Sequence, residues 1–194
     1  MENKKYELLE DDTIEVNEIT LYRIKALISF DCVDDGDLGG YIQSQENLSI
    51  DGHAWVDGNA RVDGHARVGG DAWVGGDAWV GGDAWVGGDA WVDGNARVDG
   101  HAWVGGDGDL VWFSKVGSEN GTLTVFKIKD GGAQVRRGCF IGTPQEFLTK
   151  SARVHDDKTR LEYDLLMKVA LSRLGISPLQ TEGSTNEAND DKTN

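Results

Sequence analysis

A six-residue phrase repeats without interruption through the centre of this chain and constrains its fold more than any other feature. Nine copies run from Asp51 to Val104, each reading Asp or Gly, then Gly, then Asp, Asn or His, then Ala, then Trp or Arg, then Val. Six residues bury too little surface to fold alone, so each copy must be stabilised by its neighbours. The repeat therefore predicts a solenoid.

The phrase resembles the hexapeptide repeat of left-handed parallel β-helices, in which three hexads form one triangular coil and residues eighteen apart stack. The resemblance implies that Val and Ala point inward, while glycines supply corner conformations that a Cβ would hinder. The inward positions are Val56, Val62, Val68, Val74, Val80, Val86, Val92, Val98 and Val104, with alanines from Ala54 to Ala102. The residue between Ala and Val then faces outward on a strand.

The charges at the corners favour three hexads per coil. At eighteen-residue spacing, four of the five columns examined never place two carboxylates on adjacent coils; the exception is Asp71, Asp89 and Asp107. Stacked like charges about 4.8 Å apart would be costly. A twelve-residue register would instead set Asp71 against Asp83. Recent tandem duplication would produce the same alternation, so both explanations stay open.

The outward positions form the candidate interaction surface. Its three columns and the neighbouring acidic corners are Trp55, Trp73 and Trp91; Arg61, Trp79 and Arg97; Arg67, Trp85 and Trp103; and Asp71, Asp77, Asp83 and Asp89. One interpretation is a structural ladder in which indoles stack and guanidinium groups cover aromatic faces. The other is a contact surface, because exposed aromatic patches usually meet a partner. The two are compatible.

Charge narrows the choice of partners. The 194 residues carry 19 basic and 34 acidic side chains, a net charge of −15, which argues against nucleic acid and membrane as partners. A basic protein, including a host protein that itself binds nucleic acid, remains compatible. An acidic surface that only maintains solubility is the alternative. The start lacks a signal peptide's apolar core and no segment could span a membrane, so we expect a cytoplasmic protein.

The flanks depart from the repeat. Residues 1–37 predict a β element in which a strand over 20–27 pairs with 6–9 or 13–16. The solenoid is expected over 38–108, with 38–50 as an imperfect first coil that caps it. In that coil Leu38 and Ile50 fall at the aliphatic position, and Ile42 and Leu48 fall at the small one.

Residues 109–176 predict a C-terminal α+β domain. Strand-like runs over 109–113, 122–128 and 133–141 suggest an antiparallel meander. Thr143-Pro-Gln-Glu146 reads as a helix start, with Phe147, Leu148 and Ala152 facing inward. A second helix from about Thr159 to Gly175 carries apolar residues at helical spacing, namely Leu161, Leu165, Leu166, Val169, Ala170 and Leu174. Residues 177–194 are expected to be a disordered acidic tail.

Motifs in both flanks are similar to those of hexapeptide-repeat proteins of bacteriophages and prophages. These motifs are Leu21-Tyr-Arg-Ile-Lys-Ala-Leu27, Gly36-Asp-Leu-Gly-Gly-Tyr-Ile42, Glu46-Asn-Leu-Ser49, Phe126-Lys-Ile-Lys-Asp-Gly131 and Gly138-Cys-Phe-Ile-Gly-Thr143. The resemblance covers nearly the whole chain and implies a viral origin and a solenoid. It implies no reaction, because that family carries no settled activity. The chain departs from the family in its central repeats, which are nearly identical to one another in sequence.

The sequence offers little for catalysis. Hexapeptide acyltransferases use a histidine base, but His53, His65 and His101 fall in corner columns, where a hydrogen bond to stacked Asp71 or Asp83 is expected. The Asp residues beside glycines lie on three edges and do not converge as calcium ligands must. Two isolated cysteines give no disulfide framework. Cys139 follows two arginines that could activate it, although a buried strand thiol is the simpler interpretation.

We therefore expect a non-enzymatic phage protein, without cofactor or metal, that binds a host or phage macromolecule through a rigid, acidic, Trp-lined β-helix. Countering a host defence, in the manner of anti-CRISPR inhibitors, is one version of that role. The alternatives are a transferase using an acyl or sugar-nucleotide donor, and a structural protein that self-associates into a homo-oligomer.

Overall fold

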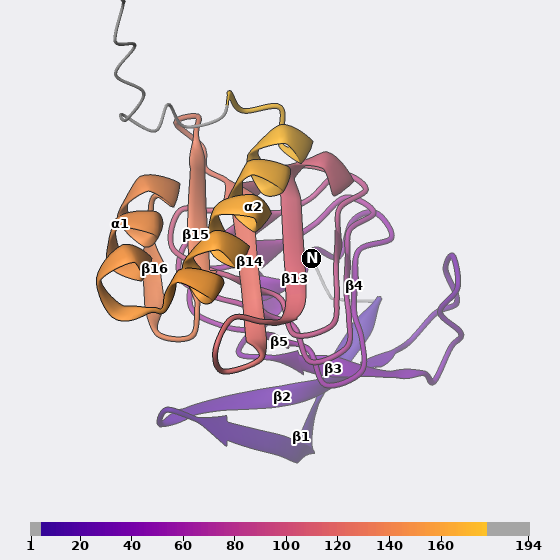
Figure 1. Ribbon diagram of the computed structural model, residues 1–194. Helices are drawn as coiled ribbons and strands as arrows, with labels where there is room; N and C mark the ends of the chain where they lie inside the picture. The colour runs from indigo at the N-terminus through magenta and orange to yellow at the C-terminus, as the bar shows by residue number, and fades with distance from the viewer. Residues whose placement is uncertain (1–4, 178–194) are drawn as a thin grey trace, which may run out of the picture.

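The computed structural model describes residues 5–177. It is mainly β, with a β-solenoid of about four turns and two C-terminal helices. Figure 1 shows an N-terminal hairpin below the coils and a sheet with two helices in front of them. The expected acidic tail lies outside the described residues except for Ser177.

The N-terminal hairpin pairs β1 (Tyr6–Val16) with β2 (Ile19–Ala26) in antiparallel fashion. The register shifts between Leu9 and Thr13, where β1 bulges. Because of this bulge, β2 pairs with both of the segments that the sequence offered as alternative partners. The predicted β element is confirmed, and it is one continuous hairpin.

The coils are built from short parallel strands. β3 (Leu38–Ile42) pairs antiparallel with β2 and parallel with the second coil, and a 3-10 helix, η1 (Gln45–Asn47), follows it. Nine two-residue strands then recur: β4 (Trp55–Val56), β5 (Arg61–Val62), β6 (Arg67–Val68), β7 (Trp73–Val74), β8 (Trp79–Val80), β9 (Trp85–Val86), β10 (Trp91–Val92), β11 (Arg97–Val98) and β12 (Trp103–Val104). They form three ladders, β4-β7-β10, β5-β8-β11 and β6-β9-β12.

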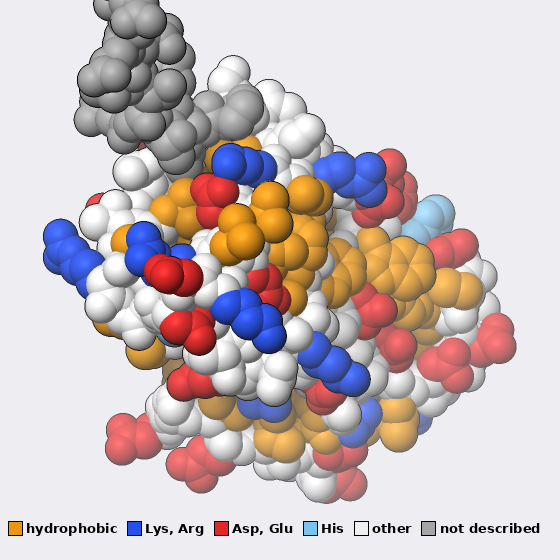
Figure 2. Space-filling model, in the orientation of Figure 1, with side chains coloured by type: hydrophobic (Ala, Val, Ile, Leu, Met, Phe, Trp, Pro, Cys, Tyr) orange, Lys and Arg blue, Asp and Glu red, His pale blue; other side chains and the backbone are white. Residues whose placement is uncertain are grey.

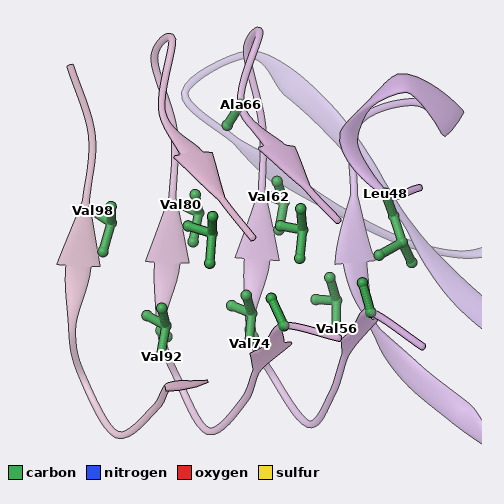
Figure 3. Close-up of a cluster of buried hydrophobic side chains, with 14 of the residues drawn as sticks. Leu48, Val56, Val62, Ala66, Val74, Val80, Val92 and Val98 are labelled. Atoms are coloured by element: carbon green, nitrogen blue, oxygen red, sulfur yellow. The ribbon is translucent and has the colours of Figure 1, made fainter. Parts of the chain in front are cut away.

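Residues eighteen apart stand side by side in these ladders. Val74, for example, pairs with Val56 on one side and Val92 on the other. Every Val and Ala of the nine hexads is buried, and Figure 3 shows valines of two ladders pointing into the narrow interior. Close packing along this axis supplies the hydrophobic stabilisation that no single hexad could provide.

The first coil does not follow the frame expected from the sequence. Ile42 pairs with Val62 and Leu48 bridges to Val68, so both occupy the Val position and not the small one. Both side chains are buried, whereas Leu38 and Ile50 are exposed. Leu48 and Val56 are eight residues apart where six would keep the repeat, and these two extra residues shift the frame.

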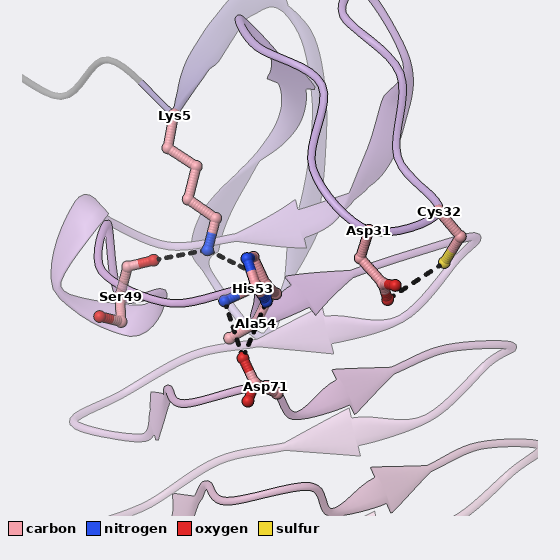
Figure 4. Close-up of polar contacts among 7 residues, drawn as sticks. All are labelled: Lys5, Asp31, Cys32, Ser49, His53, Ala54 and Asp71. Atoms are coloured by element: carbon pink, nitrogen blue, oxygen red, sulfur yellow. Dashed lines mark hydrogen bonds and ion pairs between the residues drawn. The ribbon is translucent and has the colours of Figure 1, made fainter.

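The N-terminal segment closes the first coil. This coil has no preceding coil to donate to its carbonyl oxygens. Lys5 Nζ donates to the carbonyls of Ser49 (3.1 Å) and Ala54 (2.8 Å), and Tyr6 Oη donates to that of Leu48 (2.7 Å). Figure 4 shows the Lys5 side chain extending from the residue before β1 to the loop that holds the extra residues. Without such partners, buried carbonyl groups would cost stability.

The opposite end presents N–H groups, and side-chain oxygens satisfy them. The Trp73 N–H donates to the Ala90 carbonyl of the next coil. The equivalent Trp91 N–H donates to Asp107 Oδ1 (2.9 Å), and the Arg97 N–H donates to Thr124 Oγ1 (3.2 Å). Side-chain donors thus cap the end of the solenoid that presents carbonyl groups, and side-chain acceptors cap the end that presents N–H groups.

A four-stranded antiparallel sheet follows the last coil. A 3-10 helix, η2 (Asp107–Asp109), leads into β13 (Leu110–Val116), β14 (Gly121–Lys127), β15 (Ala133–Arg137) and β16 (Phe140–Gly142). The meander is confirmed, but its expected last strand divides in two because the chain turns at Gly138, which has φ of 58°. In β14, Phe126 packs into the solenoid core, while Leu123 and Val125 pack against the helices.

The two helices cover the outer face of this sheet (Figure 1). α1 (Pro144–Val154) begins at the predicted capping box: Thr143 Oγ1 accepts from the Glu146 N–H, and the Glu146 carboxylate accepts from the Thr143 N–H. Phe147 is buried as expected, Leu148 only in part, and Ala152 is exposed, with Ser151 buried in its place.

α2 (Asp157–Arg173) carries two apolar stripes, of which only one is buried. The inner stripe includes Tyr163, Met167 and Leu171, while Leu161, Leu165 and Val169 are at least half exposed. Figure 2 shows hydrophobic side chains gathered over α2 on the viewer's face of the molecule. The helical spacing therefore predicted the helix correctly but did not distinguish its packed face from its exposed one.

Candidate binding surface

Two pairs of stacked indoles lie on the outside of the solenoid. Trp73 and Trp91 stack with ring centroids 6.0 Å apart, and Trp85 and Trp103 stack at 4.4 Å. The outer ring of each pair is the more exposed, with Trp91 52% and Trp103 42% accessible. Such pairs stabilise the coils by roughly 0.5–1.5 kcal/mol beyond their buried area. They also leave both outer indoles partly accessible to a partner.

A lysine outside the repeat reaches the second stack. Lys129 Nζ lies 5.6 Å from the centre of the Trp103 ring. This cation–π contact comes from the turn after β14, and nothing in the hexad pattern could have predicted it. With this lysine over its ring, Trp103 is still 42% accessible.

Trp55 does not belong to the surface on which the sequence places it. Its side chain is 1% exposed, and Phe30 packs edge-on against it at 5.6 Å. The segment between β2 and β3 folds over this first indole, and a Cβ at Gly39 would lie 2.7 Å from Trp55 Cζ2. The expectation that Trp55 faces water is wrong, because the N-terminal element covers the first coil on this side.

Trp79 is fixed in a polar framework and is only partly exposed. Its Nε1 donates to Asp63 Oδ2 at 2.7 Å, and the Arg136 guanidinium lies 5.8 Å from its ring centre. Arg61 and Arg97 pair with Trp79 on the adjacent coils, as the eighteen-residue register predicts. This third face therefore presents arginines and not an open indole.

Two carboxylates beneath that face are not among the functional residues predicted from the sequence. Asp63 and Asp99 are both buried, and burial raises the pKa of each carboxyl. Their partners oppose the shift: Trp79 donates to Asp63, and Arg136 Nε lies 3.2 Å from Asp99 Oδ2. The signal was present in the column Asp63, Gly81, Asp99, where the glycine leaves room for the Trp79 indole beside Asp63.

The acidic corners are open to solvent. Asp71, Asp77, Asp83 and Asp89 are exposed, which suits recognition of basic groups. Two of these carboxylates contact a histidine of the preceding coil, as expected. His53 Nδ1 lies 3.2 Å from Asp71 Oδ1. His65 Nδ1 lies 3.3 Å from Asp83 Oδ1. Asp77 accepts from Asn59 Nδ2 at 3.3 Å. These contacts are surface pairs with little effect on stability.

Arg67 and Trp85 line a shallow cleft beside η1. It encloses about 580 Å³, and its other lining residues include Glu46, Ile50 and Leu48. Trp85, the less exposed ring of the Trp85–Trp103 stack, thus lies in one cleft with residues of the first coil. An inserted side chain could gain both apolar and charged contacts there.

Within 5–177, no three His, Cys, Asp or Glu side chains gather as metal ligands would. Cys32 is exposed, and desolvation together with Asp31 raises its thiol pKa, which opposes thiolate chemistry. Cys139 is exposed in the turn between β15 and β16, so the expectation of a buried strand thiol is wrong.

No protein-family model matches the chain, and no curated protein sequence matches it. Among the described helices, none is long and apolar enough to cross a membrane. The assignment of a role therefore rests on the geometry of the surface.

Proposed function

We propose that this protein is a non-enzymatic binding module whose indole stacks and acidic corners engage a basic protein partner. The observation that carries the proposal is the pair of stacks in which Trp91 and Trp103 remain exposed on a rigid scaffold. Exposed indoles are costly to keep in water and are enriched at interaction hot spots. Nearby carboxylates add charge complementarity for Lys and Arg, which also bind aromatic faces.

The scaffold itself we propose to be a left-handed parallel β-helix with three hexads in each coil. The pairing of residues eighteen apart in all three ladders supports this geometry. A continuous hydrogen-bonded stack keeps the outward side chains at fixed separations. Rigidity of this kind lowers the ordering cost of binding.

The resemblance of both flanks to phage hexapeptide-repeat proteins suggests the setting. In an infected cell the partner would be a host or phage macromolecule, and a basic host protein that binds nucleic acid fits the charge of −15. Inhibition of a host defence factor is one version of this role.

Affinity capture with matched variants tests the proposal. Tagged full-length protein and the double variant Trp91→Ala/Trp103→Ala are each incubated with host lysate. The double variant Leu161→Ala/Leu165→Ala is the control, because it removes exposed apolar side chains from α2 and leaves the Trp stacks intact. We expect a stoichiometric basic partner on the parent and on the α2 variant, and its loss from the Trp variant. Failure to recover a partner, or equal loss from both variants, would overturn the proposal.

Self-association is a second candidate, favoured by the open stripe Leu161, Leu165 and Val169 on α2. Apolar residues at this spacing form a natural helix–helix seam. Light scattering at high concentration decides it. A monomer throughout removes this candidate, while a dimer that Leu161→Ala/Leu165→Ala dissolves supports it.

A further inference from the structure

A positively charged cleft interrupts the otherwise acidic surface where the solenoid meets the C-terminal sheet. It encloses about 640 Å³, a volume suited to a small ligand. Five cationic side chains line it: Arg61, Arg97, Lys115, Arg136 and Arg137. One carboxylate, Asp77, shares the lining. For a chain of net charge −15, this local excess of positive charge is the reverse of what composition predicts.

Two of the arginines are fixed by contacts within the fold. Arg136 pairs with buried Asp99. Arg137 Nε donates to Tyr163 Oη and its Nη2 donates to the Val116 carbonyl, each at 3.2 Å. Arg136 and Arg137 are consecutive on β15, so their side chains leave opposite faces of that strand, and Asp99 offsets the charge of Arg136.

One wall of the cleft comes from the repeat. Arg61 and Arg97 flank Trp79 in one ladder, two strand spacings or roughly 10 Å apart along the solenoid axis. Arg97 is exposed and Arg61 half-buried. The intervening Trp79 indole is held in place by the hydrogen bond that its Nε1 donates to Asp63. Lys115 completes the rim from the irregular end of β13, where its φ is 59°.

The rest of the lining is polar and contains no aromatic or aliphatic side chain that could hold a ring. It consists of Asn95, Ser114, Asn120, Gly121, Thr122 and Gly138. Amide, hydroxyl and backbone donors in a cleft lined by several guanidinium groups suit the tetrahedral oxygens of phosphate. We propose that this cleft binds the polyphosphate group of a small ligand. The site lies apart from the Trp stacks and goes beyond the binding role proposed above.

Titration calorimetry with inorganic triphosphate in low salt is the direct test. We expect saturable binding to one site that weakens through pyrophosphate to phosphate as charge is lost. Removal of one charge-assisted contact, by Arg61→Gln or Arg97→Gln, should weaken binding by about tenfold or more. Arg67→Gln is the matched control, because Arg67 holds the same position in its hexad but lines a different cleft.

Two further measurements keep the test independent of variant folding. Amide NMR shifts of the unmodified protein should change at Asn120 and Gly121 on adding triphosphate, and not at Gly69 beside Arg67. Thermal unfolding confirms that each variant is folded. The Trp91→Ala/Trp103→Ala protein should bind triphosphate like the parent, so failure of the partner proposal leaves this one standing.

Three outcomes would overturn the proposal: no saturable binding of triphosphate, an equal loss of affinity in Arg67→Gln, or tighter binding of an oligoglutamate peptide than of triphosphate. The last result would reassign the cleft to acidic peptides.

Discussion

The indole Nε1 of Trp79 donates a 2.7 Å hydrogen bond to Asp63 Oδ2 on the preceding coil. A surface column is thereby tied to a buried carboxylate, and Arg136 from the C-terminal sheet lies over the same ring. The repeat and the non-repeating domain are joined at this indole. Several expected outcomes depend on this junction and on the caps at the two ends.

Removal of the Asp63 side chain should destabilise the fold. Asp63→Ala leaves the Trp79 Nε1 without its acceptor, at an expected cost of about 1–3 kcal/mol in the free energy of unfolding. Asp63→Asn retains an acceptor oxygen and should lose less. Urea denaturation followed by circular dichroism measures both variants. Equal stability of the parent and Asp63→Ala would show that the hydrogen bond contributes nothing.

Gly81 should be intolerant of a side chain, unlike Gly69 at the same position of another hexad. A Cβ at Gly81 would lie 2.5 Å from Trp79 Cζ2 and 2.8 Å from Asp63 Oδ1. The Cβ of Gly69→Ala would meet only Ser49 Cβ, at an ordinary 3.6 Å. We expect Gly81→Ala to cost about 1–3 kcal/mol and Gly69→Ala to be neutral or slightly stabilising. Thermal melts of the two variants compare them, and similar shifts would contradict the expectation.

The buried acids should make stability depend on pH in an unusual direction. Burial raises the pKa of Asp63 and Asp99 above the value of an unfolded Asp, about 3.9. Their contribution is therefore fully present below that value and declines as pH rises through the raised pKa values. Asp63→Asn/Asp99→Asn should flatten this decline relative to the parent. Denaturant midpoints measured from pH 3 to 7 test it, and parallel curves would refute it.

Lys5 should produce the opposite trend at alkaline pH. Burial lowers its pKa to about 8, with Asp71 and Asp51 opposing the shift. The unfolded chain holds this proton more tightly, so the contribution of Lys5 to stability rises as pH increases from about 8 to its ordinary pKa of 10.5. The substitution Lys5→Met removes this pH-dependent contribution to the free energy of unfolding. The stability difference between parent and variant should therefore change across that interval, and a constant difference would contradict the assigned pKa.

A single extra hexad inserted after Val86 should disrupt the coil register. Side chains beyond the insertion would move to the next ladder, which separates Trp85 from Trp103 and the last coil from Thr124. We expect a large loss of stability and of the near-ultraviolet signal from the indole stacks. An insertion of eighteen residues is the control and should fold. Equal melting of the hexad insertion and the parent would exclude three hexads per coil.

The sequence predicted what the repeat itself determines. Val at every sixth position and Ala four places later form the buried core, and residues eighteen apart pair. These features follow from the regular spacing, because each hexad contacts the next hexads of its own coil and the equivalent hexads of the adjacent coils, eighteen residues away. The helix start at Thr143 was equally accessible, since its capping box is contained within four residues.

What the sequence did not reveal depends on contacts between distant segments. Trp55 looks like every other outward indole until the segment carrying Phe30 covers it. Leu161 and Tyr163 both suit a packed helix, and only the position of the sheet decides which one is buried. The cleft at Arg136 joins residues of the repeat to residues after it, and no periodicity encodes that meeting.

The caps at the two ends have a consequence for how far such a molecule can grow. The uncapped strands of a terminal coil would present unpaired N–H or carbonyl groups, with which another copy of the protein could pair. A repeat this regular would then extend into a fibre. Lys5 and Tyr6 occupy the acceptors of the first row, and Asp107 and Thr124 occupy the donors of the last. These caps therefore oppose end-to-end addition of a second solenoid, and we expect removal of either cap to expose a strand row that favours polymerisation.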